Sequence, residues 1–449
     1  MSFNETEIRE LQLTSLKPIT QRGWRSRLLI IVLSIFVVAG IAAYVYQLIR
    51  GLNVTGLNDD VFFGIYMTNL VAIIGISYGG AIVSAILRIT HASWRAPITR
   101  LAEALAVVSL IVGALFAIIH LGHAERLWLI FTTPNPASPV LWDIIAITTY
   151  LIATLIFFYL PLIPDLAIIR SRFPSVIGKW RTRLYSMLSL KWKGSPKQQS
   201  ILRSSTNLMA LLIIPLAVSV HSVLAWAFSV SGREGWHSSI FGPYFVVAAL
   251  FSGVAAVIIV VAVFRKAYGL DKVIGPKQIR YLGYLMLVLG LTYIYFTFAE
   301  YLTEGYVQTE ASVVLIDSML LGRFAPLFWF FMVSTGIVPV LLIAFPKTRT
   351  IRWITFAAVL VVIGMWLKRL LIVVPPLQHG FFGSETAAYT GSWVEFTITL
   401  GAIAAIPLML LVIFRIFPVL SVSEIEEVAA EETERQAKAV PQIGEEVKA

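Results

Sequence analysis

Two ionisable side chains at the ends of neighbouring apolar stretches are the strongest candidates for chemistry in this sequence. His120 ends the stretch FAIIH, and Asp143 opens the next apolar stretch, after SPVLW. Ionisable groups are costly within a membrane unless they are paired or take part in binding or proton transfer. A quinone or quinol needs a flat apolar slot, a hydrogen-bond partner at each oxygen and a group that exchanges protons near neutral pH. The two side chains meet that need, and a structural ion pair between two helices is the alternative.

Five other side chains are weaker candidates for the same chemistry. They are His123, His221, His237, Glu300 and Arg369. His221 lies deep within an apolar stretch, where a histidine usually hydrogen-bonds a neighbouring helix, and a proton relay is the alternative. His237 follows a polar loop and either covers a site or sits among lipid headgroups. Its neighbour Trp236 is typical of the aromatic belt at a membrane interface.

Charged residues on two later apolar stretches raise the same question. Glu300 and Glu304 are four positions apart and therefore share one helix face. We expect both to be exposed at the interface, with a role in a proton exit as the alternative. Lys368 and Arg369 are adjacent, so they point in different directions around a helix. We expect one cation to extend to the headgroups and the other to face the interior and a carboxylate.

The composition is that of a protein with many membrane spans. Of 449 residues, 58% are hydrophobic and 13% are charged, against about 45–50% and 25% in soluble domains. The chain has no cysteine, which excludes disulfides, thiolate zinc sites and cysteine-bound iron–sulfur clusters within it. Its six histidines are not placed as the facing pairs that ligate haem. We therefore expect no metal, haem or cluster in this chain, and we attribute the net charge of +10 to topology rather than to nucleic-acid binding.

Ten apolar stretches are long enough to cross a bilayer, which takes about 20 residues per helix. They are 28–49, 62–87, 101–121, 140–164, 206–230, 240–264, 281–302, 324–345, 353–374 and 393–417. Lys and Arg concentrate in alternate connecting segments, at 22–27, 88–100, 170–203, 265–280 and 347–352. The positive-inside rule then places both termini in the cytoplasm and His120 and Asp143 at the outer face. We expect an all-α, multi-pass protein of the cell inner membrane.

The sequence divides into one membrane domain and several polar segments. Residues 1–27 form an N-terminal cytoplasmic segment, and 28–420 form the ten-helix domain. Residues 165–205 form a basic cytoplasmic loop within this domain. The tail at 421–449 is rich in Glu, and we expect it to be solvated and partly helical in the cytoplasm.

Six segments along the chain form a combined pattern. They are 120–122, 138–150, 162–167, 235–245, 364–366 and 417–419. Together they resemble the NrfD/PsrC family of membrane subunits of respiratory complexes, and within it the ActC-type subunit of alternative complex III. The resemblance implies two four-helix bundles and two further helices, the first bundle at about 62–164 plus a flanking helix and the second at about 206–345 plus flanking helices.

The same resemblance implies a site and a partner. It implies a quinone site near the outer face, beside an iron–sulfur protein, and no cofactor bound in the subunit itself. On that pattern His120 and Asp143 match positions assigned to quinol contact. Three positions depart from the family pattern: His123 replaces an arginine, Ala227 replaces a carboxylate that is linked to proposed proton paths, and Lys368 replaces a glutamate. Proton translocation therefore stays open, as does the choice between alternative complex III and a molybdopterin oxidoreductase.

The most consistent function is a quinone-reactive membrane subunit beside other membrane subunits. Menaquinone or a similar quinone is the expected substrate, and an iron–sulfur or molybdopterin-type peripheral subunit is the expected electron partner. His120 would exchange a proton with one quinone oxygen, and Asp143 would orient that imidazole or receive its proton. A secondary transporter is the alternative, because Pro215 and Pro339 interrupt spans, although transporters place polar sites near mid-membrane. A structural anchor with a degenerate quinone site is a third possibility.

Overall fold

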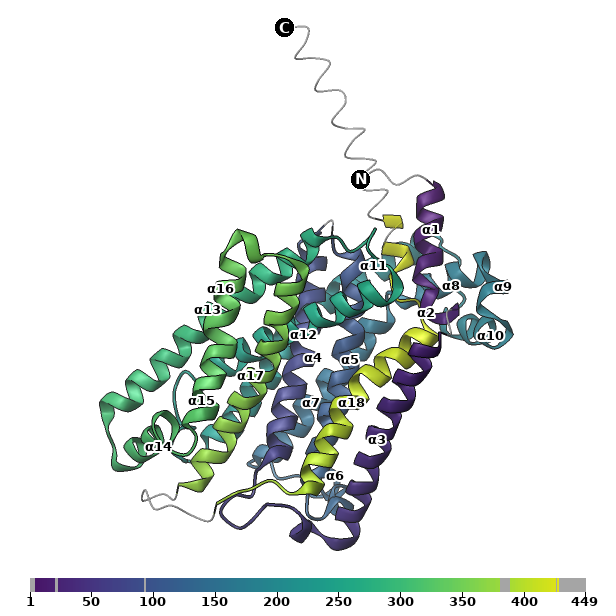
Figure 1. The fold of residues 1–449 in the computed structure, drawn as a ribbon. Coiled ribbons are helices and arrows are strands. Elements are labelled where there is room, and N and C mark those ends of the chain that lie inside the picture. The colour runs from purple at the N-terminus through teal and green to yellow at the C-terminus, as the bar shows by residue number, and fades with distance from the viewer. Residues whose placement is uncertain (1–4, 21–22, 93, 380–387, 425, 428–449) are drawn as a thin grey trace.

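The regular elements of the described chain are helices, and ten of them are long and apolar enough to cross a membrane (Figure 1). The computed structural model describes residues 5–20, 23–92, 94–379, 388–424 and 426–427. The spans are α3 (Trp24–Arg50), α4 (Ile65–Ile89), α5 (Ala96–Ile119), α7 with α8 (Pro139–Tyr159 and Leu162–Arg172), α11 (Pro196–Ser229), α12 (Phe241–Tyr268), α13 (Pro276–Val307), α15 with α16 (Ala325–Met332 and Val338–Ala344), α17 (Ile351–Gln378) and α18 (Trp393–Ile416). The ten expected spans are confirmed.

Shorter helices lie between the spans and at the N-terminus. They are α1 (Glu5–Ser15), α2 (Lys17–Thr20), α6 (Leu129–Thr132), α9 (Pro174–Ile177), α10 (Lys179–Leu188) and α14 (Glu310–Leu320). Single 3₁₀ turns lie at Leu52–Val54, Ala124–Arg126 and Pro346–Thr348. The segment 165–205 is therefore largely helical rather than an open loop, since α8, α9, α10 and the start of α11 fall within it.

Local sequence explains where several spans begin, break or bend. Helix α11 begins ten residues before the expected span, because Ser195 and Gln198 form a capping box that satisfies the first backbone donors. The fourth span breaks between α7 and α8 at Leu160 and Pro161, since a proline cannot continue the hydrogen-bond ladder. The eighth span contains a π turn at Val333–Ile337, just before Pro339, where the wider turn accommodates the missing donor.

The spans form two groups of four, flanked by a helix pair. In the first helix group, α4 packs against α5 and α11, and α7 packs against α5 and α11. The second helix group comprises α12, α13, α15 with α16, and α17. Helices α3 and α18 pack on each other beside α5 and α4. The expected grouping was wrong for the fifth span: α11 packs mainly against α7 and α4 of the first group.

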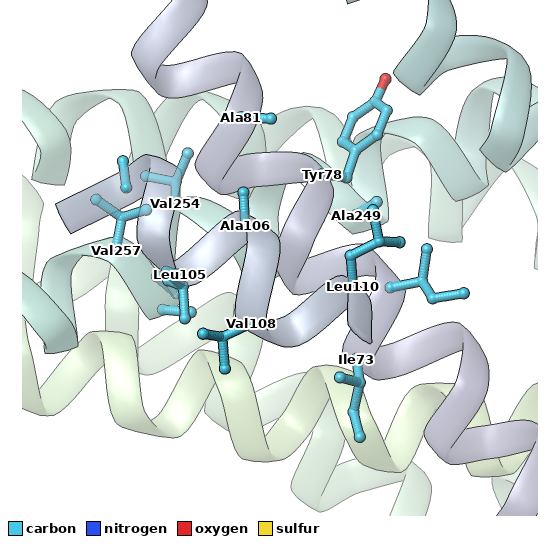
Figure 2. Packing of buried hydrophobic residues seen from close by; sticks show 14 of the residues in the cluster. Ile73, Tyr78, Ala81, Leu105, Ala106, Val108, Leu110, Ala249, Val254 and Val257 are labelled. Atoms are coloured by element: carbon cyan, nitrogen blue, oxygen red, sulfur yellow. The ribbon is translucent and has the colours of Figure 1, made fainter. Parts of the chain in front are cut away.

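The two groups meet where α4 crosses α12. A Cβ atom on Gly79 would overlap the backbone of Gly253, so these helices touch through glycine backbone. Small and branched side chains fill the surrounding layer, including Ala81 of α4, Ala106 of α5 and Val254 of α12 (Figure 2). Small residues let helix backbones approach closely in a membrane, where packing rather than water exclusion drives association. This joint fixes the first helix group against the second.

Both ends of the described chain meet at one end of the bundle, which we call the terminal face. The Val419 backbone nitrogen donates to the Ser15 carbonyl at 3.1 Å, and Gln12 donates to Glu426 at 2.6 Å. Residues 419, 420 and 422 are fully buried. We call the opposite end of the bundle, where α5 ends and α7 begins, the site face.

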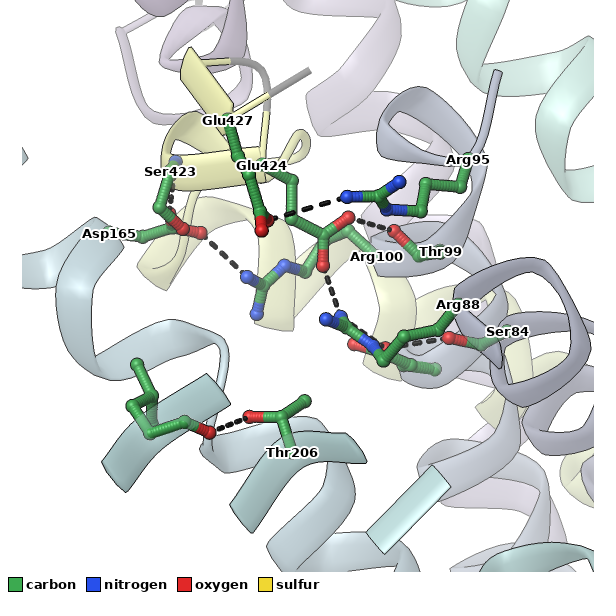
Figure 3. Close-up of polar contacts among 12 residues, drawn as sticks. Ser84, Arg88, Arg95, Thr99, Arg100, Asp165, Thr206, Ser423, Glu424 and Glu427 are labelled. Carbon is green, nitrogen blue, oxygen red and sulfur yellow. Dashed lines mark hydrogen bonds and ion pairs between the residues drawn. The ribbon is translucent and has the colours of Figure 1, made fainter. Parts of the chain in front are cut away.

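A buried ionic network fastens Ser423 and Glu424 to the terminal face (Figure 3). Glu424 accepts hydrogen bonds from Arg88 and, at 2.9 Å, from Thr99. Asp165 pairs with Arg100 at 2.6 Å and accepts a hydrogen bond from the Ser423 backbone at 2.7 Å. The expectation of a solvated tail was therefore wrong for its first residues. Arginines on α4 and α5 lie inside the protein and need carboxylates, which the tail and α8 supply.

Glu424 is held ionised by this network. Burial raises the pKa of its carboxyl, but the charges of Arg88 and Arg100 outweigh burial and leave that pKa below its usual value. A depressed pKa in the folded state means that the contact stabilises the fold at neutral pH. As the pH falls below the ordinary pKa of a glutamate, this stabilisation decreases. It is lost once the pH passes the lower pKa that Glu424 has in the folded protein.

Replacing Glu424 with alanine is expected to destabilise the protein by about 3 kcal/mol, because Arg88 loses its nearest carboxylate and keeps only Glu103, at 3.9 Å. The measurement is the thermal unfolding midpoint of the purified protein in detergent. Glu426→Ala is the matched control: Glu426 also pairs with an arginine, Arg172 at 2.6 Å, but both side chains are partly exposed, and such a pair contributes less than about 1 kcal/mol. Equal midpoints for the two variants would contradict the buried network.

Candidate binding site at the end of the first helix group

A cavity of about 130 Å³ lies among the four helices of the first group at the site face. Two of its lining residues are ionisable, His120 and Asp143. The others are apolar: Phe63, Met67, Leu70, Ala117, Leu121, Pro139, Val140, Ile144, Ile147, Leu224, Ala227 and Phe228. The two side chains singled out in the sequence are therefore brought to one cavity, although they come from different helices and are separated by a loop.

His120 follows the last residue of α5 and is oriented by its own helix. Its Nδ1 lies 3.0 Å from the carbonyl oxygen of Phe116, one turn earlier. A carbonyl only accepts hydrogen bonds, so Nδ1 carries the proton in this contact and Nε2 of a neutral ring is left as an acceptor. The ring of Phe63 lies 6.0 Å away, edge to face. The imidazole is thus held in one tautomer and supported on one side by an aromatic wall.

A polar residue of α3 holds the end of α5 beside this histidine. Gln47 is buried and donates to the Ile119 carbonyl at 2.9 Å, while its own carbonyl oxygen accepts from the Tyr66 hydroxyl. Ile119 directly precedes His120, so Gln47 ties the last turn of α5 to α3 and α4. This residue was not among the candidates predicted from sequence. Its signal was a single amide within an otherwise apolar span.

Asp143 lies in the second turn of α7, whose start is built by its sequence. Pro139 occupies the first turn, where its missing N–H is not needed, and Trp142 donates to the Pro136 carbonyl at 2.7 Å, which pins the preceding loop. Among the described residues no hydrogen bond or ion pair joins Asp143 to His120. Both side chains therefore face the cavity without satisfying each other.

Trp236 supports the cavity wall from the second helix group. It is 1% exposed, and its indole nitrogen donates to the Ile372 carbonyl of α17 at 2.6 Å. Its ring packs on Phe228, which lines the cavity, with centroids 4.9 Å apart. The expectation that Trp236 belongs to the interfacial belt was wrong. Its indole has a buried carbonyl partner, and the residue couples α17 to the wall of the cavity.

Two of the weaker candidates lie outside the cavity. His123 is exposed and its Nδ1 lies 2.7 Å from Glu125. His237 is also exposed, with Nδ1 3.0 Å from the Arg233 carbonyl. Each imidazole is thus engaged with a neighbour in its own loop, and neither lines the cavity beside His120.

His221 lies deeper on α11, below the cavity. Its ring packs against Tyr78 of α4 with centroids 4.6 Å apart, and the residue is 1% exposed. No hydrogen bond from His221 to another helix is found among the described residues. It lines a second, smaller cavity together with Tyr293 and Arg369. The histidine therefore lies between the two helix groups and faces the cationic side chains of α17.

A buried ion pair occupies the second helix group. Lys368 lies 3.4 Å from Glu300, and the two residues are 2% and 8% exposed. The ammonium is surrounded by the rings of Tyr244, Tyr301 and Phe331, at 5.4, 5.2 and 5.7 Å from their centroids. Cation–π contacts of this kind stabilise a buried charge. The prediction that one of the adjacent cations faces a carboxylate is confirmed.

Two related expectations were wrong. Glu300 is not exposed at the interface, because Lys368 holds it inside the helix group. Arg369 does not extend to the headgroups either: it is buried and donates to Ser252 at 3.1 Å and to the Ala248 carbonyl at 3.2 Å. Both cations of α17 are therefore internal.

Comparison with known proteins matches residues 53–379 to the family model described as polysulphide reductase, NrfD. A protein of Halobacterium salinarum, provisionally named as a membrane subunit of dimethyl sulfoxide reductase, is 27% identical over 87% of this chain and 89% of its own length. The Hdr-like menaquinol oxidoreductase integral membrane subunit of Archaeoglobus fulgidus is 25% identical over 90% and 96% of the two chains. The menaquinone reductase integral membrane subunit of Nitratidesulfovibrio vulgaris is 22% identical over 84% and 87%. The matched region contains the whole cavity.

Proposed function

Because the chain belongs to the polysulphide reductase NrfD family, we propose that it is the membrane subunit of a respiratory oxidoreductase complex that binds quinone or quinol beside His120 and Asp143. The observation that carries this proposal is an apolar cavity among four spans whose ionisable lining residues are these two. Relatives that match most of the chain are named as menaquinol oxidoreductase and menaquinone reductase subunits. Menaquinone or a similar quinone is therefore the proposed substrate.

Each part of the cavity has a role in this reaction. The apolar side chains of α4, α7 and α11 would contact the ring and the start of the isoprenoid tail. Oxidation of a quinol releases two protons and two electrons, and the protons must leave from its two hydroxyls. Nε2 of His120 accepts a proton from one hydroxyl, since Nδ1 is engaged with Phe116. The unpartnered carboxylate of Asp143 accepts the other. Quinone reduction uses the same groups in reverse.

The electrons must pass to another subunit. The sequence has no cysteine, so this chain supplies no thiolate ligand for an iron–sulfur cluster. We place the partner, of the iron–sulfur or molybdopterin type, at the site face, with other membrane subunits beside the spans. The positive-inside rule supports an orientation with the terminal face in the cytoplasm and the site face outside the inner membrane.

Two finer parts of the proposal concern the kind of complex and proton translocation. The segments at 138–150 and 235–245 support the ActC-type assignment, while the named relatives support a reductase complex. His221, Arg369, Lys368 and Glu300 supply polar groups that continue from below the cavity into the second helix group, and this continuity supports coupling to proton movement. The position of the cavity at the helix ends favours a quinone site over a transporter site.

Filling the cavity is expected to weaken quinol binding without touching either ionisable group. Ala227→Phe adds an aromatic ring to a residue that lines the cavity, so we expect KM for a menaquinol analogue to rise about tenfold or more, the equivalent of about 1.4 kcal/mol. The measurement is steady-state turnover of the complex against quinol concentration. Val230→Phe is the control, because Val230 is 59% exposed near the same helix end. An unchanged KM in Ala227→Phe would place the substrate elsewhere.

A further inference from the structure

Helix α10 is an amphipathic helix attached to the terminal face, outside the ten spans. Its inward residues, Arg181, Leu184, Tyr185 and Leu188, follow the spacing of one helix face. Tyr185 is buried and its hydroxyl donates to the Ile416 carbonyl. Arg181 donates to the Arg415 carbonyl at 3.1 Å. The helix is thereby fastened to the last turn of α18.

These contacts set the depth of α10 relative to a bilayer. Arg415 and Ile416 are the last residues of the span α18, and Arg415 also donates at 3.1 Å to Ser26, in the first turn of the span α3. The ends of spans lie at the level of the lipid headgroups. Figure 1 shows α9 and α10 beside the bundle, next to these helix ends. Helix α10 therefore lies at headgroup level, beside the lipid-facing helices.

The outward side of α10 lines an open hollow with the chemistry of a phosphate site. Lys179, Thr182, Arg183 and Ser186 repeat at helical spacing and line it together with Arg170 and Pro174. Three cations and two hydroxyls are thus directed to one place, and no carboxylate lines it. Arginine and lysine with neighbouring hydroxyl donors form charge-assisted hydrogen bonds to phosphate oxygens.

Large apolar side chains near this hollow are exposed. Trp180 is 55% exposed, Met187 is 67% exposed and Leu190, just beyond α10, is 62% exposed. Trp180 and Met187 lie seven positions apart, at one margin of the outward face of the helix. An exposed Trp beside a basic stripe is typical of a helix that lies in a membrane interface, with its apolar side among acyl chains. Free phosphate would leave these side chains in water.

The segment 170–203 is positively charged, as binding of an anionic lipid requires. Residues 170–203 contain Arg and Lys but no Asp or Glu. The acidic tail pairs with Arg172 and Arg203, through Glu426 and Glu427. Within the described residues no carboxylate pairs with Lys179 or Arg183, so their charges are available to a ligand.

We propose that the hollow lined by Arg170, Lys179 and Arg183 binds the phosphate group of an anionic phospholipid, whose acyl chains contact Trp180, Met187 and Leu190. The lipid would hold α10 and the end of α18 at the membrane surface. This site is independent of the quinone cavity, which lies at the opposite end of the first helix group.

The test measures lipid retention by the full-length protein. Protein purified in a neutral detergent is titrated with phosphatidylglycerol or phosphatidylcholine, and bound lipid is counted by native mass spectrometry. We expect phosphatidylglycerol to be retained in preference to phosphatidylcholine. Lys179→Gln with Arg183→Gln is expected to weaken phosphatidylglycerol binding about tenfold or more. Unchanged helix content and unfolding midpoint would show that this variant is folded.

Two cations outside the hollow provide a control that distinguishes a specific lipid site from general electrostatic attraction. Lys277 and Arg280 are exposed, lie three positions apart at the start of the span α13, and do not line the hollow. Lys277→Gln with Arg280→Gln should leave phosphatidylglycerol binding unchanged. If both double variants lost the same amount of phosphatidylglycerol binding, the proposal would be overturned. The lipid would then be attracted to basic loops in general and not to this hollow.

Two further experiments identify the ligand. Trp180→Ser with Met187→Ser should weaken phosphatidylglycerol binding, and inorganic phosphate should not displace the lipid. If phosphate displaces the lipid and the apolar pair has no effect, the hollow is a site for free phosphate and the proposal fails. It also fails if lipid retention is unchanged in Lys179→Gln with Arg183→Gln while a protein subunit is lost from the purified complex, because the surface is then a protein interface.

Discussion

Asp143→Asn is expected to lower quinol-dependent electron transfer by the complex about 100-fold or more, the usual contribution of a positioned proton acceptor. Asparagine keeps the size and polarity of the side chain, but it replaces one acceptor oxygen with an NH2 donor and does not take up a proton. Asp143 makes no ion pair within the described residues, so its loss leaves no buried cation uncompensated and the complex should still assemble. The measurement is turnover with a menaquinol analogue, alongside the yield of intact complex after purification.

Glu125→Gln is the control for this variant. Glu125 lies in the connection that precedes α7, and its side chain is 69% exposed. Among the described residues its only ion pair is with His123 of the same connection. We expect its turnover to match that of the unaltered protein. Full activity in Asp143→Asn, with the complex intact, would remove this carboxylate from the reaction.

His120→Ala is expected to cause a loss of similar size. The change removes Nε2, the proposed proton acceptor, and also the ring that bonds to Phe116 and packs on Phe63. Because His120 and Asp143 act on one quinol, the double variant should lose little more than either single variant, as is usual for groups that act as a unit. Turnover of the two single variants and the double variant measures this coupling.

His123→Ala provides the matched histidine control, since His123 lies three positions away but is exposed and outside the cavity. Its turnover should be unchanged. If the losses of His120→Ala and Asp143→Asn simply multiplied in the double variant, the two groups would act in separate steps. That result would contradict a shared substrate between them.

The ten spans could be predicted because the bilayer sets the length of an apolar segment that crosses it. All ten spans were found from runs of apolar residues, and the boundaries moved only where caps, prolines or short helices intervened. The packing partners could not be found in this way. Helix α11 was assigned to the wrong group, since hydropathy does not report which neighbours a helix contacts.

The placement of charged residues shows the same limit. The partner of Lys368 lies 68 positions earlier, at Glu300, and that of Thr99 lies 325 positions later, at Glu424. Partners so far apart in the sequence do not follow a helical repeat, so the sequence pattern does not predict them. Basic residues near span ends also serve as topology signals, so the buried role of Arg88 and Arg100 was hidden among arginines that remain at the surface.

The sequence could indicate two residues that line one cavity, but it could not indicate their contacts. The cost of ionisable groups near apolar spans pointed to His120 and Asp143, and the structure brings both to one cavity. The sequence suggested that Asp143 either orients the imidazole or receives its proton. In the structure the carbonyl of Phe116 does so, and Gln47 steadies the helix end through Ile119. Backbone partners of this kind have no signature in side-chain sequence.

Photolabelling with an azido-naphthoquinone tests the central claim most directly, because it reports where the quinone ring lies rather than what a substitution does. The purified complex is illuminated with the label, with and without excess menaquinone, and the labelled peptides are mapped. We predict menaquinone-sensitive labelling within 63–70, 117–121, 139–147 and 224–228, the segments that line the cavity. Labelling confined to the segments around Glu300 and Lys368, or labelling at the cavity that excess menaquinone does not reduce, would contradict the account.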